Sequence, residues 1–442
     1  MIRSRTALSA LVLAGASSLL LAACTTASSP GDESSESASS SAKADPAANC
    51  SVEQSTDPLA IGTVLPLTGT LAYLGPPAIA GINQAVADIN AAGGVLGQPA
   101  EITTATDSGD SNDMTVSSNA ATQLIDAGVS VAVGAESSSV TLNIVDQLTS
   151  NCIVEISPAN TATSLSGYSS YYFRTAPPDS VQGSALGQQI VADGNANVAF
   201  LVFNDTYGTG LRDSVQSSVE SSGGQVVYGG NGEGQEFPPG QTTFSSEVSA
   251  AIASDPDAIV ILAFDETASI VPELVAQGWD MSTVYMSDGN TADYSEDFEP
   301  GTLEGAKGTI PGADASDEFK QTLATSYQQQ EGGTLTDYSY AAESYDAVIL
   351  TALAAQAGGG TDAGTIQANM AAVSGAEGGT ECSTFAECLT ALEAGDSIQY
   401  RGVSGIGPFN ENNDPSSAQI GVYTFDADNK PVYTTGIEGD VE

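Results

Sequence analysis

The residues with the most evident chemistry lie between positions 153 and 183. A short apolar strand that contains Ile153, Val154 and Ile156 runs into Ser157-Pro158 and then into the small hydroxyl and amide residues ANTATS. In open parallel sheets, hydroxyls and backbone N–H groups at the carboxyl ends of strands form the places where small ligands bind. The stretch therefore predicts a binding site for a small polar solute.

Two other predicted strand ends carry groups that could hold the charged parts of a solute. Residues 134–139 read GAESSS where a strand gives way to a helix, and helix N-termini favour anions. Asp288 ends a later strand, and a buried carboxylate needs a cationic partner. The chain has only 9 Lys and Arg residues, so a ligand amine is an attractive partner. Ordinary capping of a helix or turn by Ser or Asp is the structural alternative at both places.

The composition excludes several classes of function. The chain contains no histidine, so Ser-His-Asp and Cys-His catalysis and histidine-bearing metal sites are impossible. A net charge of −46 leaves no basic patch for nucleic acid. The acidic clusters near Asp107 and Asp426 lack the order of a calcium-binding loop. We therefore expect no enzyme activity, cofactor, metal or nucleic-acid partner, although a hydrolase built on Asp265-Glu266 is a weaker alternative.

Two motifs resemble one known family. SPANT at 157–161 and FRTAPPDSVQG at 173–183 are similar to the branched-chain amino-acid (Leu/Ile/Val) binding proteins, the solute-binding subunits of ABC importers. The resemblance runs from about residue 59 to the end. It implies an α/β type I periplasmic-binding fold with two doubly wound βα lobes, a three-segment hinge and a solute in the cleft. The expected ligand is a branched-chain or related aliphatic amino acid. An amide or urea ligand, or a sensory role, remains open.

The resemblance also implies roles for residues of the first lobe. Ser138 falls where the relatives bind the ligand's α-carboxylate, and Ser139 is a neighbouring candidate. Ala159 would offer a backbone carbonyl to the α-ammonium group. Thr161 would offer a hydroxyl or N–H to the carboxylate.

In the second lobe, the resemblance implies that Tyr207 closes over the ligand and that Asp288 pairs with its ammonium group. Further pocket candidates are Tyr73, Leu74, Phe264 and Tyr340. The sequence departs from the family at two of these positions. The relatives typically carry Glu in place of Asp288 and an aromatic residue in place of Leu74. Both departures weaken a preference for Leu, Ile or Val.

The pattern of elements agrees with two lobes. The apolar run from Leu59 to Leu67 indicates a strand buried on both faces, and strands then alternate with amphipathic helices. The same pattern restarts after Pro177-Pro178, and the chain is expected to return to the first lobe near 305–312. The predicted lobes are 57–177 plus 312–407 and 178–311 plus 414–442, with a third hinge crossing at 408–413.

The N-terminus predicts export. Arg3 and Arg5 precede an apolar run that ends in LAAC at 21–24, which resembles a lipoprotein signal. Residues 1–23 would be the signal peptide, Cys24 the lipidated residue and 24–56 a disordered tether. We therefore expect an extracytoplasmic, lipid-anchored monomer whose partners are a membrane permease and its ATPase subunits.

The other four cysteines are Cys50, Cys152, Cys382 and Cys388. An even number in an exported chain suggests two disulfides. Cys382 and Cys388 would close a short local loop, and Cys50 could join Cys152 within the first lobe. Three pairings are possible, and the sequence does not choose among them.

Overall fold

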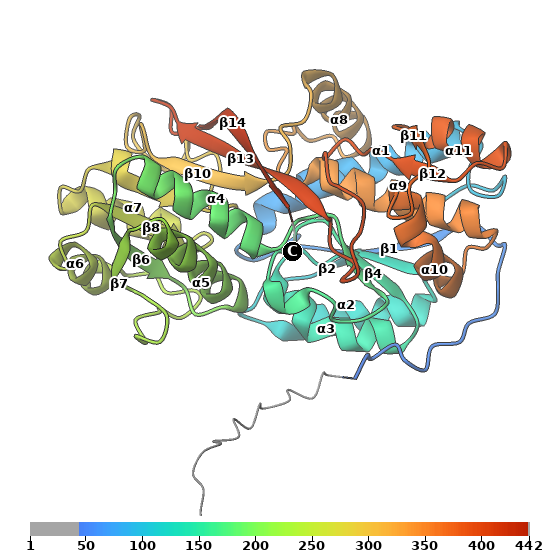
Figure 1. Cartoon of the computed structure of the whole chain (residues 1–442), viewed down its shortest axis with the longest axis horizontal. Coiled ribbons are helices and arrows are strands. Elements are labelled where there is room, and N and C mark those ends of the chain that lie inside the picture. Colours follow the sequence, from blue (N-terminus) through green and yellow to red (C-terminus); the bar gives the residue numbers. More distant parts are fainter. Residues whose placement is uncertain (1–43, 441–442) are drawn as a thin grey trace, which may run out of the picture. The chain divides into compact units, whose positions relative to one another are not determined.

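The computed structural model describes residues 44–440 (Figure 1). The predicted signal peptide, Cys24 and the tether up to residue 43 lie outside the described residues. In the part described, the strands form one five-stranded sheet, one seven-stranded sheet and one short pair. One parallel sheet and one mostly parallel sheet, each surrounded by helices, confirm the predicted α/β class.

The first sheet has the strand order β2-β1-β3-β4-β5, and all its strands are parallel. Its strands are β1 Ala60–Leu65, β2 Glu101–Asp107, β3 Val131–Gly134, β4 Val154–Ser157 and β5 Tyr172–Arg174. Alternate side chains of these strands enter two cores. Ile61, Val131 and Val133 face one, while Val64 and Ala132 face the other. This explains the unbroken apolar run in the sequence, because both faces of the sheet are covered.

Helices from two distant parts of the chain cover those faces. One layer contains α2 Met114–Ala127 and α3 Ser138–Ser150, which pack against β1, β2 and β4. The opposite layer contains α1 Gly75–Ala91 together with α9 Ala341–Gly358 and α10 Ala363–Ser374 (Figure 1). Helix α8 Asp317–Gln330 packs on α1, and α11 Phe385–Glu393 packs on α9. The late helices therefore complete the first half of the molecule.

The second sheet has the order β14-β13-β10-β9-β8-β6-β7. Its parallel strands are β6 Asn197–Val202, β7 Gln225–Tyr228, β8 Ala258–Leu262, β9 Val284–Met286 and β10 Lys307–Pro311. Antiparallel strands β13 Ser417–Phe425 and β14 Pro431–Asp440 extend one edge. Four helices pack around this sheet: α4 Asp179–Ala192, α5 Thr206–Ser221, α6 Ser245–Ala253 and α7 Thr267–Ala276.

The chain passes three times between the two halves, after β5, after β10 and before β13. The three crossings lie side by side. The Gly312 amide donates to the Gln419 carbonyl at 2.8 Å, and the Ala313 amide donates to the Ser404 carbonyl at 3.1 Å. Arg174 at the first crossing forms a buried ion pair with Asp414 at the third, with 2.6 Å between Nε and Oδ1. The boundaries predicted for the lobes, and any movement about these crossings, stay predictions.

Three details differ from the expectations. Residues 307–311 form β10 inside the second sheet, and this strand was not predicted. Helix α11 and the parallel pair β11 Thr380–Cys382 and β12 Ile398–Tyr400 were not predicted. Residues 44–56, predicted as tether, pack on the folded body. Asp45 accepts a hydrogen bond from the Ser169 hydroxyl at 2.7 Å, and the Ser55 amide donates to Asp362 at 3.1 Å.

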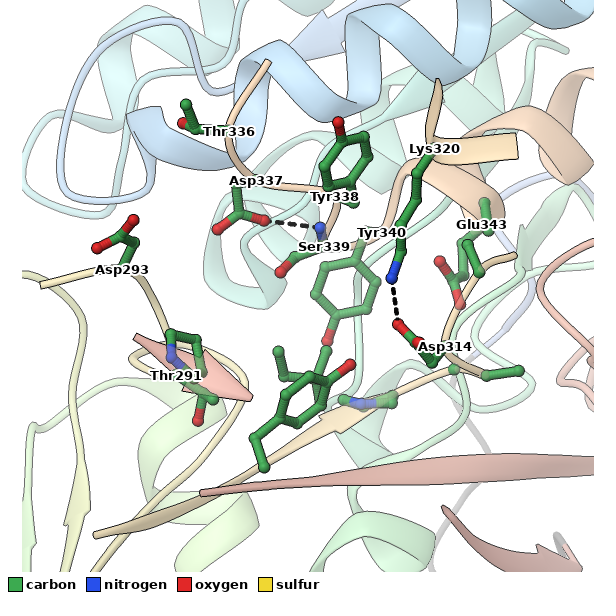
Figure 2. Close-up of a pocket in the computed structure, with 18 of the residues that line it drawn as sticks. Thr291, Asp293, Asp314, Lys320, Thr336, Asp337, Tyr338, Ser339, Tyr340 and Glu343 are labelled. Carbon is green, nitrogen blue, oxygen red and sulfur yellow. Dashed lines mark hydrogen bonds and ion pairs between the residues drawn. The ribbon is translucent and has the colours of Figure 1, made fainter. Parts of the chain in front are cut away.

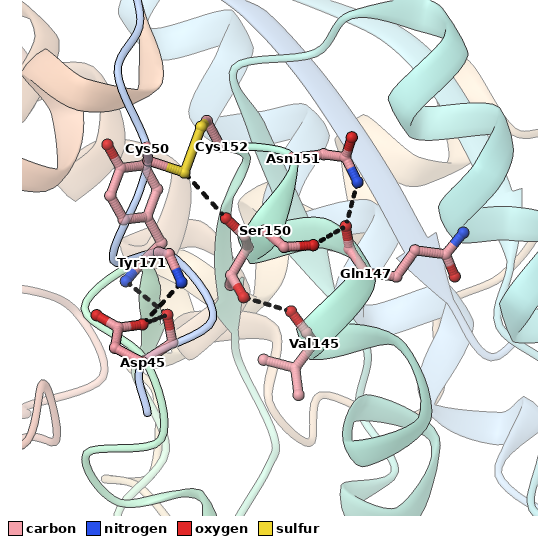
Figure 3. The surroundings of a disulfide bond; sticks show 11 residues. Asp45, Cys50, Val145, Gln147, Ser150, Asn151, Cys152 and Tyr171 are labelled. Carbon is pink, nitrogen blue, oxygen red and sulfur yellow. Dashed lines mark hydrogen bonds between the residues drawn. A yellow bond between two sulfur atoms is a disulfide. The ribbon is translucent and has the colours of Figure 1, made fainter. Parts of the chain in front are cut away.

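Both suggested disulfides are present, Cys50–Cys152 and Cys382–Cys388. Figure 3 shows the first of them beside Asp45 and Tyr171, where it ties the N-terminal segment to the turn between α3 and β4. This bond spans 102 residues, and closing so large a loop restricts the unfolded chain strongly. Within the described residues, no helix is long and apolar enough to cross a membrane.

Candidate solute-binding site

The carboxyl ends of strands from both sheets meet around a small cavity. From the first half, it is lined by Leu71, Leu74, Glu136, Ser137, Ser138, Ala159 and Tyr340. From the second half, Tyr207, Phe264, Asp288 and Gly289 complete the wall. The accessible space is about 20 Å³, close to what a single water needs. A solute as large as an amino acid can therefore enter only if the two halves move apart.

Asp288 is the most strongly held group of this cavity. It follows β9, and it is 6% exposed. Tyr207 donates a hydrogen bond to its Oδ1 at 2.7 Å, and Tyr340 donates to its Oδ2 at 2.6 Å. Burial raises the pKa of Asp288, and these two hydrogen bonds oppose that rise. Tyr340, which precedes α9, belongs to the first half, and Tyr73 of the same half donates to the Asp288 carbonyl at 3.2 Å. Asp288 therefore links the two halves.

The predicted serines lie at the start of α3 with different partners. The Ser138 hydroxyl accepts from the Ala162 amide at 3.2 Å, so it holds the loop after β4. The Ser139 hydroxyl accepts from the Thr206 amide of the other half at 3.4 Å and does not line the cavity. Ser137 lines the cavity, and its buried hydroxyl has no partner. Ser137 was not predicted, although it belongs to the same run of three serines.

The loop after β4 is fixed by the side chain of Ser157. Its hydroxyl donates to the Ala135 carbonyl at 2.6 Å and accepts from the Asn160 amide at 3.0 Å. Ala159, a predicted site residue, lines the cavity. Thr161 is buried next to it, and its carbonyl accepts from the Asp179 amide at 2.6 Å, but Thr161 does not line the cavity.

Apolar and aromatic side chains form the rest of the wall. Tyr207 and Phe264 are stacked, with ring centroids 5.4 Å apart and an interplanar angle of 15°. Leu74 lines the cavity on the opposite side, at the end of a short helical turn. Tyr73 is only partly buried and reaches Asp288 rather than the cavity.

Two buried acids near the cavity were not predicted. Glu136 lines it, is 3% exposed, and neither of its carboxylate oxygens has a partner. Burial raises the pKa of Glu136 well above its usual value, and the charge of Asp337 adds to that rise. Asp179, the first residue of α4, is fully buried, and burial and the charge of Asp288 raise its pKa to about 8. The sequence GAES at 134–137 places an acidic residue between a strand and the serines at the start of a helix, and this position could have singled out Glu136.

Tyr340 also separates the cavity from a second, larger hollow of about 370 Å³. Figure 2 shows Tyr338 and Tyr340 projecting into this space beside the ion pair of Lys320 with Asp314. Asp337, whose carboxylate accepts from the Ser339 amide at 2.7 Å, lies on its far side. Among the described residues, no group of acidic and cysteine side chains could hold a metal ion.

Sequence comparison places this arrangement among known proteins. The profile of the family described as "periplasmic binding protein" matches residues 58–387, most of the chain. The chain belongs to the periplasmic binding protein family. A Leu/Ile/Val-binding protein homologue from Brucella melitensis is 27% identical over 192 residues, which are 43% of this chain and 50% of that protein. The chain thus spans about half the length of the curated relatives it matches first.

Solved structures of this family share the fold. A substrate-binding protein of a branched-chain amino-acid transporter from Streptococcus pneumoniae, in complex with isoleucine, has a TM-score of 0.69 at 22% identity. That match covers 87% of this chain and 100% of the other. A solute-binding protein from Rhodopseudomonas palustris in complex with p-hydroxybenzoic acid also has a TM-score of 0.69, at 16% identity, covering 87% and 98%. The type I periplasmic-binding fold implied by the sequence resemblance is therefore confirmed.

Proposed function

We propose that this periplasmic binding protein captures an α-amino acid between its two halves and delivers it to an ABC importer. One observation carries the proposal: a buried carboxylate, Asp288, at the meeting point of both halves, with no cationic side chain among the residues that line the cavity. A ligand ammonium group would supply the missing positive charge. The names of the curated relatives support an amino acid, of which branched-chain or related aliphatic ones were the expectation.

The proposed capture uses groups on both sides of the cavity. Hydroxyl and N–H groups around Ser137, Ser138 and Thr161 would receive the ligand's carboxylate, and the Ala159 carbonyl would receive its amine. Asp288 and Tyr207 would close over the ligand from the second half. Because the ligand contacts both halves only when they approach, binding favours the closed form. No step of this process changes the ligand chemically, so we propose a binding protein rather than an enzyme.

We further propose that the protein acts outside the cytoplasm as a monomer attached to the membrane through a lipid on Cys24. In its closed form it would dock on a permease whose ATPase subunits drive import. The family match supports the extracytoplasmic location.

A second candidate function is the binding of a smaller solute such as an amide or urea, for import or for sensing. The small space of about 20 Å³ in the closed cavity favours this alternative. A urea-sized ligand would need less separation of the halves than an amino acid.

A thermal-shift screen of the purified full-length chain against the common amino acids, short amides and urea tests both candidates. A ligand that binds the folded state only stabilises it by about 2.7 kcal/mol at a concentration 100 times its Kd. We expect a rise in Tm of several degrees with at least one amino acid and no rise with urea. A rise with amides or urea alone would replace the amino acid by the second candidate, and no shift with any α-amino acid would contradict the proposed function.

A further inference from the structure

Glu136 is an acidic residue of the cavity that a simple zwitterionic ligand does not explain. Glu136 is one of the residues that line the cavity, it is 3% exposed, and both of its carboxylate oxygens are buried without a hydrogen-bond partner. The peptide carbonyl of Glu136 is held, because the Asn160 amide group donates to it at 2.7 Å. The backbone is thus fixed by the loop after β4, while no hydrogen bond holds the carboxylate.

The surroundings offer this carboxylate no positive charge. The other acids at the site are Asp288, which lines the cavity, and Asp179, which is fully buried and has no hydrogen-bond partner for either oxygen. Asp337 is the third, and its negative charge adds to the rise in the pKa of Glu136. The positive charge of Arg174 lowers the pKa of Asp179, but its guanidinium group is already bonded to Asp414 and to the carbonyls of Asn160 and Ala162. The lining residues include no Lys or Arg.

A plain aliphatic amino acid leaves this imbalance in place. It has no net charge, and its single ammonium group would pair with Asp288. Glu136 would stay buried either as an unpaired charge, which is strongly unfavourable, or as a neutral acid without a partner. A cationic group on the ligand side chain would satisfy it.

We propose that the ligand is a basic α-amino acid and that Glu136 binds the ammonium or guanidinium group of its side chain. The inference rests on the proposed function, in which Asp288 receives the α-ammonium group. It replaces the aliphatic side chain of that proposal by a cationic one. Leu71, Leu74 and Phe264 then contact the methylene groups of the ligand side chain.

Binding of such a ligand also moves a proton. Burial raises the pKa of Glu136 well above its usual value, which favours the protonated form in the unliganded protein. When the ligand cation arrives, the carboxyl O–H bond breaks, the proton leaves to the solvent, and the carboxylate pairs with the cation. The net reaction therefore releases up to one proton for each ligand bound.

Isothermal titration of the full-length chain with lysine and norleucine tests this inference, because the two ligands differ only by the terminal ammonium group. We expect lysine, ornithine or arginine to bind about a hundredfold more tightly than norleucine or leucine, as a buried charge-assisted contact allows. Titrations in two buffers of different ionisation enthalpy should show proton release for the basic ligand. Glu136→Gln should remove both the preference for the basic ligand over norleucine and the proton release.

The outcomes separate this inference from the proposed function. If the unaltered chain binds leucine or norleucine as tightly as all three basic amino acids, or more tightly, the inference is overturned. Amino-acid capture would still stand in that case. That comparison needs no variant, so it holds even if Glu136→Gln does not fold. Unchanged lysine affinity in a folded Glu136→Gln protein would likewise overturn the role of Glu136. If no α-amino acid binds at all, both the inference and the proposed function fail.

Discussion

At the scale of single residues, Asp288 illustrates how a cavity can keep a carboxylate ready for a cation. Its two oxygens accept hydrogen bonds from Tyr207 and Tyr340, which come from different halves of the molecule. Hydrogen bonds to the charged form favour ionisation, whereas burial opposes it. The two tyrosines therefore hold Asp288 in position and partly offset the cost of its burial.

The first prediction concerns this group. Asp288→Ala should abolish binding of any aminated ligand, because the ammonium group would lose its buried counter-charge. Tyr340→Phe should weaken binding about tenfold, since it removes one of the hydrogen bonds that favour the ionised carboxylate. Titration calorimetry measures both, and circular dichroism should show an intact fold.

Asp297→Ala is the control, because Asp297 is exposed in the segment between β9 and β10. Its ligand affinity should equal that of the unaltered chain. If Asp288→Ala kept full affinity, Asp288 would have to be removed from the site.

At the scale of elements, the local pattern of the sequence predicted most of the fold. Strand β1 was expected in the run 59–67 and is found at Ala60–Leu65. Apolar runs and capping residues act locally, so they can be read from the chain. Strand β10 was missed because Gly308 and Pro311 interrupt its pattern, and its assignment depends on pairing with the distant strand β13.

The site was predictable only in part, for a similar reason. Tyr207, Asp288 and Ala159 were found through family motifs, and all three line the cavity. Ser139 and Thr161 do not line it. Ser137 and Ser138 line the cavity and Ser139 does not, because of the turn at the start of α3, which spacing alone does not specify. Glu136 becomes unusual only when its burial is known.

The second prediction of this section concerns the crossings between the halves. Arg174→Met should lower the free energy of unfolding by about 3–5 kcal/mol, because Asp414 would become a buried unpaired charge. The same change removes the hydrogen bonds that Arg174 donates to the Asn160 and Ala162 carbonyls and to the Ser166 hydroxyl. Denaturation in urea measures the change.

A double change, Arg174→Met with Asp414→Leu, should cost less than the sum of the two single changes, because no lone charge is left. Arg401→Met is the matched control, since its ion pair with Glu381 is exposed and should contribute about 1 kcal/mol or less. Equal losses for Arg174→Met and Arg401→Met would show that the buried pair does not hold the crossings together.

At the scale of the whole molecule, acidity dominates. The chain has 55 acidic and 9 basic residues, so self-repulsion grows as its carboxyl groups ionise. Buried acids also make the folded protein less stable as the pH rises. Burial and the charge of Asp288 raise the pKa of Asp179 to about 8, and burial raises the pKa of Glu343 to about 8. Both groups lie close to the place where the two halves meet.

These shifts predict how stability depends on pH. An unfolded Asp or Glu titrates near pH 4. Between pH 4 and 8, the folded protein therefore holds protons on Asp179 and Glu343 that the unfolded chain has lost. The free energy of unfolding should fall as the pH rises through this window, by about 1.4 kcal/mol per unit for each group. Above pH 8 these two groups should add no further loss.

Asp179→Asn isolates one of these contributions, because an amide of nearly the same shape does not titrate. In urea denaturation at a series of pH values, the slope between pH 5 and 7.5 should be shallower in this variant than in the unaltered chain. Asp317→Asn, at an exposed position in the first turn of α8, should keep the original slope. If Asp179→Asn also kept it, Asp179 would be ionised in the folded protein at neutral pH. A cationic ligand would then meet two charged carboxylates, Asp179 and Asp288, on the side of the second half. Its affinity should then rise less steeply with pH than if Asp179 lost its proton only near pH 8.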